Sequence, residues 1–277
     1  MYMHVAYSPR LTLADSKYIT LQKPEVVART ALALGAVSHK VTHAATPELL
    51  ANVHSLKYIK DVMYGRVPDG FGTTDYAVMM QAMWACGAMK KGMEVALEYG
   101  NCLVPASGFH HASYASNWGY CTFNGMILAA VLSGKKTLII DGDAHYGDGC
   151  VDIIDKLKLG GRIHYRQCFE PLEKIADLES YGLVIYQPGA DSMEEGPNLS
   201  MADFRLRDYC IFVQCLQAGV PVLWCLGGGY KSLGAVTKIH TGSIRILDAV
   251  IKEHLALSSG TPGAVLGGKT RALSTHP

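Results

Sequence analysis

Three carboxylates and one imidazole lie within eight residues of the chain, from Asp141 to Asp148. In this stretch the carboxylate of Asp143 and the imidazole of His145 stand two residues apart, so both can reach one cation if the loop curls. A third ligand must come from elsewhere, and Asp191 is the best candidate. Two carboxylates and one histidine would suit a hydrolytic divalent metal site with positions open for water and a carbonyl. The alternative is that these aspartates are turn residues that bond their own backbone.

A pair of adjacent histidines, His110 and His111, forms a second group of reactive side chains. Neighbouring side chains diverge, so the two rings do not suit a single metal ion. They suit two imidazoles in acid–base catalysis, each of which needs a carboxylate to orient it. Asp141 and Asp148 are available for that role. Ordinary hydrogen-bonded loop histidines are the alternative.

A run of three glycines, Gly227–Gly229, precedes Tyr230. Glycine allows the backbone to approach a ligand closely, so the phenol would stand where it can donate to a developing oxyanion. A phosphate-binding loop is another use of glycine-rich segments. The chain contains neither GxGxxG nor GxxxxGKS/T, so a nucleotide site has little support.

Each of these polar groups follows a predicted strand. Short apolar or β-branched runs predict strands at 4–7, 102–104, 137–140, 162–165, 183–186 and 220–226. Capping residues and periodicity predict helices that begin near residues 24, 46, 75, 123, 151, 200 and 232. This alternation predicts an α/β fold in which helices flank both faces of a mostly parallel sheet. The carboxyl ends of parallel strands share one edge, so the four polar loops should converge there.

The composition is that of an ordinary globular protein. Of the 277 residues, 49% are hydrophobic and 18% are charged, and the net charge is +1. Such a chain has no basic field to bind nucleic acid or an anionic membrane. We expect a single domain over residues 1–257 and a loosely ordered tail over 258–277, which is rich in Ser, Gly, Thr and Pro.

Cysteine usage and the amino terminus predict a cytoplasmic protein. The eight cysteines include no CxxC pair, which favours reduced thiols over disulfides. The first residues lack the features of a signal peptide, and no apolar run approaches the about 18 residues that span a bilayer. Export and membrane anchoring are therefore not expected.

The chain resembles the histone deacetylase superfamily, which includes bacterial acetylpolyamine amidohydrolases. Five segments carry the resemblance, in the family's order: 107–112 (SGFHHA), 119–124 (GYCTFN), 141–149 (DGDAHYGDG), 187–191 (QPGAD) and 226–230 (LGGGY). The resemblance implies an arginase-like α/β fold. It also implies one catalytic Zn²⁺, with Fe²⁺ or Co²⁺ as alternatives, bound by Asp143, His145 and Asp191. A structural K⁺ held by the 141–145 loop is a further implication.

The same resemblance assigns roles to the other polar residues. His110 and His111 resemble the tandem imidazoles of the family, paired with Asp141 and Asp148 respectively, and Tyr230 resembles the phenol that polarises the amide carbonyl. Three further residues are expected to bind substrate: Phe109, Gly119 and Tyr120. Tyr120 would form a wall of a narrow channel for a linear alkyl amine.

We therefore expect a metal-dependent hydrolase that removes an acetyl or other short acyl group from a small acylated amine or an acyl-lysine. One alternative is a non-catalytic sensor of acyl ligands. Another is an arginase-type ureohydrolase, which needs a second carboxylate where this chain has Gly147. The sequence departs from the family pattern at Tyr146, commonly a histidine, and near His164, commonly a serine. No secure match exists within 66–69 for the rim aspartate of eukaryotic deacetylases.

Overall fold

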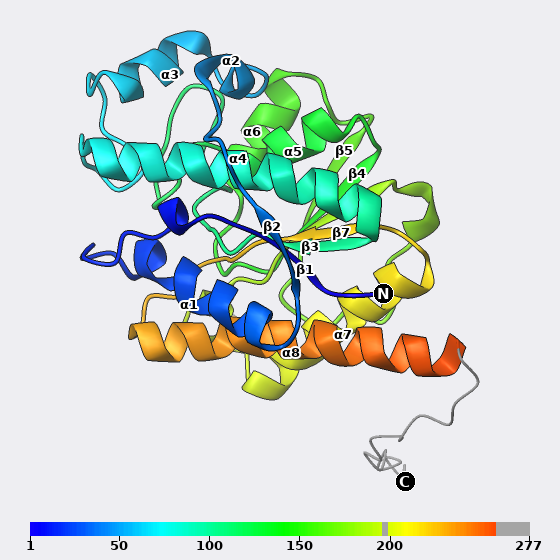
Figure 1. Cartoon of the computed structure of the whole chain (residues 1–277). Coiled ribbons are helices and arrows are strands. Elements are labelled where there is room, and N and C mark those ends of the chain that lie inside the picture. The colour runs from blue at the N-terminus through cyan, green and yellow to red at the C-terminus, as the bar shows by residue number, and fades with distance from the viewer. Residues whose placement is uncertain (196–198, 259–277) are drawn as a thin grey trace, which may run out of the picture.

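The described part of the chain, residues 1–195 and 199–258 of a computed structural model, forms a seven-stranded parallel sheet between two layers of helices (Figure 1). The strand order is β2-β1-β3-β7-β6-β4-β5. Every pairing in the sheet is parallel. The predicted α/β fold with a parallel sheet is confirmed.

The strands are short, and the central ones are buried. Their bounds are β1 His4–Tyr7, β2 Val37–Lys40, β3 Asn101–Leu103, β4 Thr137–Asp141, β5 Ile163–Gln167, β6 Leu183–Gln187 and β7 Val222–Trp224. Six of them match predicted strands within a few residues. The edge strand β2 was missed because its side chains are mostly exposed and show no apolar alternation. All five residues of β4 are buried, as a strand covered on both faces requires.

Helices α4, α5 and α6 lie on one side of the sheet, with α2 and α3 beyond them, and α1, α7 and α8 lie on the other side (Figure 1). The bounds are α1 Ile19–Ala33, α2 Pro47–Leu50, α3 Leu56–Met63, α4 Tyr76–Tyr99, α5 Gly125–Ser133, α6 Asp148–Lys156, α7 Met201–Gln217 and α8 Leu233–Ser258. Each layer closes its own apolar core against the sheet. The sheet is therefore covered by buried apolar side chains on both faces.

Helix ends follow the expected capping chemistry. The hydroxyl of Thr46 accepts from the amide of Leu49, and Asp75 caps α4 through the amide of Ala77. Ser200 and Asp203 form a complete capping box at α7. Glycines end α4 and α5 in the left-handed conformation.

Three boundaries differ from the prediction. Helix α1 begins at Ile19 and contains Pro24, which was expected at its start. Helix α6 begins at Asp148, three residues early, so this carboxylate occupies the first turn, where the helix dipole favours an acid. Helix α8 continues to Ser258, and the rest of the predicted tail, 259–277, lies outside the described residues.

Two further observations concern the described residues. None of the helices in 1–195 and 199–258 combines the length and apolar character needed to cross a bilayer.

All eight cysteines are free thiols and seven are buried, as the absence of paired spacing predicted. Burial raises the pKa of the Cys121 and Cys225 thiols, so both stay protonated.

Candidate active site

Four loops meet at the carboxyl edge of the sheet. Strand β4 ends at Asp141, which pairs with Gln187 at the end of the neighbouring strand β6. The loop after β4 carries Asp143 and His145, and a short 3₁₀ helix after β6, Ala190–Met193, carries Asp191. The convergence that the parallel sheet predicted is thus present in space.

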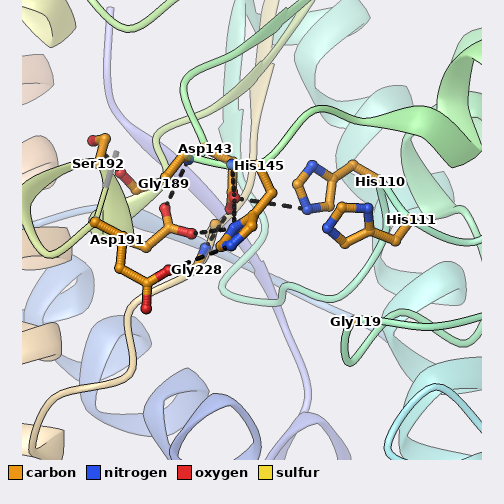
Figure 2. A network of polar contacts seen from close by, with 12 residues as sticks. His110, His111, Gly119, Asp143, His145, Gly189, Asp191, Ser192 and Gly228 are labelled. Carbon is orange, nitrogen blue, oxygen red and sulfur yellow. Dashed lines mark hydrogen bonds and ion pairs between the residues drawn. The ribbon is translucent and has the colours of Figure 1, made fainter. Parts of the chain in front are cut away.

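Asp143, His145 and Asp191 form the only cluster of three or more His, Cys, Asp or Glu side chains within the described residues that could hold a metal ion. One ligand atom from each lies within 4.8 Å of the others. The Nδ1 atom of His145 is 3.2 Å from Oδ1 of Asp143 and 3.1 Å from Oδ2 of Asp191 (Figure 2). Both carboxylates are buried, whereas the imidazole is partly exposed. Their spacing lets all three side chains point at one small cation.

The electrostatics of this group fit a divalent cation. Burial and the charge of Asp143 raise the pKa of Asp191 to about 8. The hydrogen bond with Asp143 raises the pKa of His145 to about 9, although burial opposes this. Two buried carboxylates so close together repel each other. A bound dication would relieve this repulsion, and oxygen and nitrogen donors are those that zinc and similar ions accept.

Glycines allow the three loops to pack this closely. A Cβ atom on Gly189 would lie 2.3 Å from Cα of Asp143, and one on Gly228 would lie 2.3 Å from Oδ2 of Asp191. The amide of Gly228 also donates to Oδ2 of Asp143 over 2.8 Å. The glycine run was predicted to bring the backbone close to a ligand. In the structure it brings the backbone close to the carboxylates of Asp143 and Asp191.

His110 is buried and tied to a fully occupied carboxylate. Its Nδ1 lies 2.9 Å from Oδ2 of Asp141. Asp141 also accepts from the hydroxyl of Tyr165, the side-chain amide of Gln187 and the backbone amide of Asp143. Burial alone would lower the pKa of His110, but the charges of Asp141 and Asp143 outweigh it and raise the pKa to about 9.

The second imidazole, His111, is also buried but pairs with a more exposed carboxylate. Its Nδ1 lies 2.6 Å from Oδ1 of Asp148, whose side chain is about half exposed. Burial and the neighbouring His110 lower the pKa of His111. The indole N–H of Trp118 donates to the other oxygen of Asp148 over 2.9 Å. Both histidine–aspartate pairs that the resemblance implied therefore lie within hydrogen-bonding distance.

The remaining wall of the site comes from Tyr230 and an acidic segment. The ring of Tyr230 lies 6.3 Å from that of His145, and burial raises the pKa of its phenol. The backbone amide of Tyr230 donates to Glu194 over 2.7 Å, and Glu195 lies 3.4 Å from Nε2 of His145. Neither glutamate was expected at the site.

A cavity of about 400 Å³ opens onto these groups. Its lining residues are His111, Trp118, Gly119, Tyr120, His145, Glu195 and Tyr230. Gly119 and Tyr120 both line this cavity, and their binding of substrate stays a prediction. Phe109 does not line it, because its side chain is 1% exposed and packs in the core against Gly125. Only one aromatic residue of the expected pair, Tyr120, therefore lines the cavity, and this corrects the prediction.

Two other sequence features have structural explanations. His164 lies in strand β5 beside Leu138 of β4, and its Nδ1 forms a hydrogen bond with the hydroxyl of Tyr181. It therefore lies within the sheet and not in the 141–145 loop. The buried guanidinium of Arg207 donates to the carbonyl of Gly142 in that loop, over 2.9 Å. Asp69 is buried, and its carboxylate accepts from the backbone amides of Phe71 and Thr73 in its own turn.

Several site residues were missed by sequence reasoning. Trp118 and Tyr165 bond the two orienting aspartates, and Arg207 bonds the metal-ligand loop. Lys23, buried on α1, donates to the carbonyl of Gly227 over 2.6 Å. Of these residues, only Trp118 could have been placed near the site from the sequence, because it directly precedes the 119–124 segment that resembles the family.

The carboxyl edge of the parallel sheet holds an Asp-His-Asp group and two histidine–aspartate pairs. This places the protein in the class of α/β proteins that have a hydrolase-type site. Residues 20–158, half of the chain, match the histone deacetylase domain. The chain belongs to the histone deacetylase family. Asp191 and Tyr230 lie beyond the matched residues, and their place in the site rests on the geometry described above.

The chain is also similar to a curated protein. The chain is 26% identical over 191 residues to an uncharacterized protein of Picosynechococcus sp. (strain ATCC 27264 / PCC 7002 / PR-6). The alignment covers 55% of this chain and 64% of that protein, so the chain spans less than two thirds of the length of this relative.

Proposed function

We propose that this protein is a metal-dependent deacylase that hydrolyses the amide of a small acylated amine or of an acyl-lysine side chain. The observation that carries the proposal is the shared location of three elements: the Asp143, His145 and Asp191 group, two oriented imidazoles and one phenol. Membership of the histone deacetylase family supports the same class of reaction.

Asp143, His145 and Asp191 would hold the ion, with zinc as the first choice and Fe²⁺ or Co²⁺ as alternatives. When bound, a divalent ion would polarise the amide carbonyl and lower the pKa of the attacking water toward neutrality. Backbone amides hold both carboxylates, because Gly228 donates to Asp143 over 2.8 Å and Ala144 donates to Asp191 over 3.1 Å. Such preorganisation keeps the ligand loops from moving apart.

His111 is the proposed general base. Its lowered pKa leaves the ring neutral near pH 7, and its Nδ1 is engaged by Asp148. The Nε2 atom is then free to take a proton from the water as the C–O bond forms. Passing this proton to the leaving nitrogen as the C–N bond breaks yields a carboxylic acid and an amine.

His110 and Tyr230 are the proposed stabilisers of charge. His110 is held by the buried carboxylate of Asp141, whose charge favours the protonated ring, so this imidazole would support negative charge that develops on the carbonyl oxygen. The phenol of Tyr230 keeps its proton because burial raises its pKa, and it can donate to the oxyanion.

The two alternatives receive less support. An arginase-type site needs a carboxylate at position 147, but a Cβ atom on Gly147 would already lie 2.5 Å from the hydroxyl of Tyr165. A non-catalytic acyl-ligand sensor would tolerate the loss of an acid–base group. Both histidines, both orienting aspartates and the tyrosine are present and lie at the site.

The test combines metal analysis with a panel of acylated substrates. Purified protein should hold one divalent ion per chain and release acetate from acetyl-lysine or acetylated linear amines. Asp191→Ala should lose the ion, because the two remaining ligands cannot close the site. Asp155→Ala, at an exposed aspartate of α6, is the matched control and should keep it. Unchanged stoichiometry and affinity in Asp191→Ala would remove this residue from the proposed metal shell.

A further inference from the structure

Trp118 contacts the Asp148–His111 pair through two different parts of its side chain. The indole N–H donates to Oδ2 of Asp148 over 2.9 Å, while His111 occupies Oδ1 over 2.6 Å. Each oxygen of this carboxylate therefore has its own donor. Because the two donors fix both ends of the carboxylate, the group cannot rotate without losing one of them.

The indole ring also covers one face of His111. Its centroid lies 3.8 Å from that of the imidazole, with 36° between the planes. His110 lies 4.0 Å away from the same imidazole. His111 is thus enclosed by two rings and held at Nδ1, so its Nε2 is the atom left to face the cavity.

The backbone around Trp118 is itself fixed. Trp118 and Cys121 form an isolated antiparallel bridge, and the side-chain amide of Asn117 donates to the hydroxyl of Tyr58 and the carbonyl of Pro68. Gly119 and Tyr120 follow in the left-handed conformation. A tightly held loop can set the position of an exposed side chain that a free loop could not.

The need for such support follows from the location of Asp148. Its side chain is 46% exposed at the start of α6, where water competes for its oxygens. Asp141, which orients His110, is buried and needs no such help because protein donors surround it. The half-exposed pair is the one that Trp118 braces.

We propose that Trp118 is a positioning residue that holds the Asp148–His111 pair with Nε2 of His111 directed at the substrate. The inference rests on the proposed function, because it names a residue that supports the proposed base. Trp118 does this through two contacts: its indole N–H donates to the carboxylate of Asp148, and its ring packs against the imidazole of His111.

The kinetic test uses Trp118→Phe, which keeps a ring and removes the N–H. We expect kcat to fall about tenfold, as for loss of a hydrogen bond to a charged group, with KM and metal content unchanged. Trp118→Leu removes the ring as well and should lose more. Trp84→Phe, at a half-buried tryptophan of α4 beneath Arg10, is the matched control and should keep wild-type kcat.

A double-mutant cycle separates positioning from general damage. In an Asp148→Asn background, adding Trp118→Phe should lower kcat by less than about twofold, because the carboxylate that the N–H supports is already gone. Losses that simply multiply would show that Trp118 acts elsewhere, and wild-type kcat in Trp118→Phe would overturn the inference.

A structural readout covers the case in which no substrate is turned over. The indole N–H resonance of Trp118, assigned by its absence in Trp118→Phe, should shift in Asp148→Asn and stay in place in Asp155→Asn. An unmoved resonance in Asp148→Asn overturns the inference by itself. A wild-type protein that hydrolyses nothing in the panel would instead defeat the proposed function.

Discussion

His110 and His111 are neighbours in the chain but lie in different environments. His110 is buried against a carboxylate with four donors, and the charges of Asp141 and Asp143 raise its pKa. His111 is paired with a half-exposed carboxylate, and burial lowers its pKa. Titratable groups whose environments push their pKa values apart are typical of a divided acid–base task. The proposed roles of base and charged partner follow this division.

Alanine at either histidine should therefore lower turnover severely without removing the ion. General acid–base catalysis is typically worth about 10²–10⁴-fold, and His111→Ala should be the more damaging variant because it removes the base. The measurements are kcat on an acetylated amine and metal content by elemental analysis. Wild-type rates in both variants would contradict the mechanism, and loss of the ion from either would assign that histidine to the metal shell.

Tyr230→Phe isolates the phenolic hydroxyl. Removing a single oxyanion donor typically lowers kcat by about 100-fold or more, so we expect a loss of that order with KM little changed. The ring itself remains to pack against Tyr120, which lies 5.8 Å away. Tyr146→Phe, at an exposed tyrosine outside the cavity, serves as the control for removal of a hydroxyl. A rate in Tyr230→Phe equal to that of the control would exclude the donor role.

At the scale of elements, the predictable features are those written in local sequence. Strand β4 and its loop were recognisable because an apolar run leads directly into aspartates and glycines. The capping box of α7 was equally local. Strand order is not local, so the reach of Lys23 and Arg207 from helices into the site could not be predicted. Phe109 was placed wrongly because adjacency to a reactive residue does not fix the direction of a side chain.

The loop that carries Tyr120 belongs to the approach to the site. Tyr120 has a φ of 62° and its ring lies near those of Tyr18, Phe71 and Tyr230. An aromatic wall favours a long methylene chain by about 0.8 kcal/mol for each buried CH₂ group. Tyr120→Ala should therefore lower kcat/KM for a long linear acetylamine far more than for a short acetamide. Steady-state kinetics on both substrates decide this, and equal losses would mean that the ring only supports the loop.

At the scale of the whole molecule, the site depends on the helical layer behind it. Lys23 on α1 is fully buried and donates to Gly227, and its Nζ lies 3.5 Å from His240 on α8. The glycine run that contacts Asp143 is therefore held from behind by a lysine from a distant part of the sequence. Burial lowers the pKa of Lys23 to about 8, although Asp191 and Asp143 oppose this.

This lysine should make stability depend on pH in a defined direction. A free lysine has a pKa of 10.5, so between about pH 8 and that value the unfolded chain binds more protons at this residue than the folded protein. The destabilising contribution of Lys23 is complete below pH 8 and disappears as pH rises through this window. The Lys23→Met variant has no titrating group at this position. The difference in the free energy of unfolding, wild type minus Lys23→Met, should therefore rise by up to about 3 kcal/mol from pH 7.5 to 10.5. Urea unfolding in the presence of EDTA measures this free-energy difference. Lys40→Met, at an exposed residue of β2, is the control for the loss of one charge. A difference that stays constant across the window would mean that Lys23 remains charged in the folded protein.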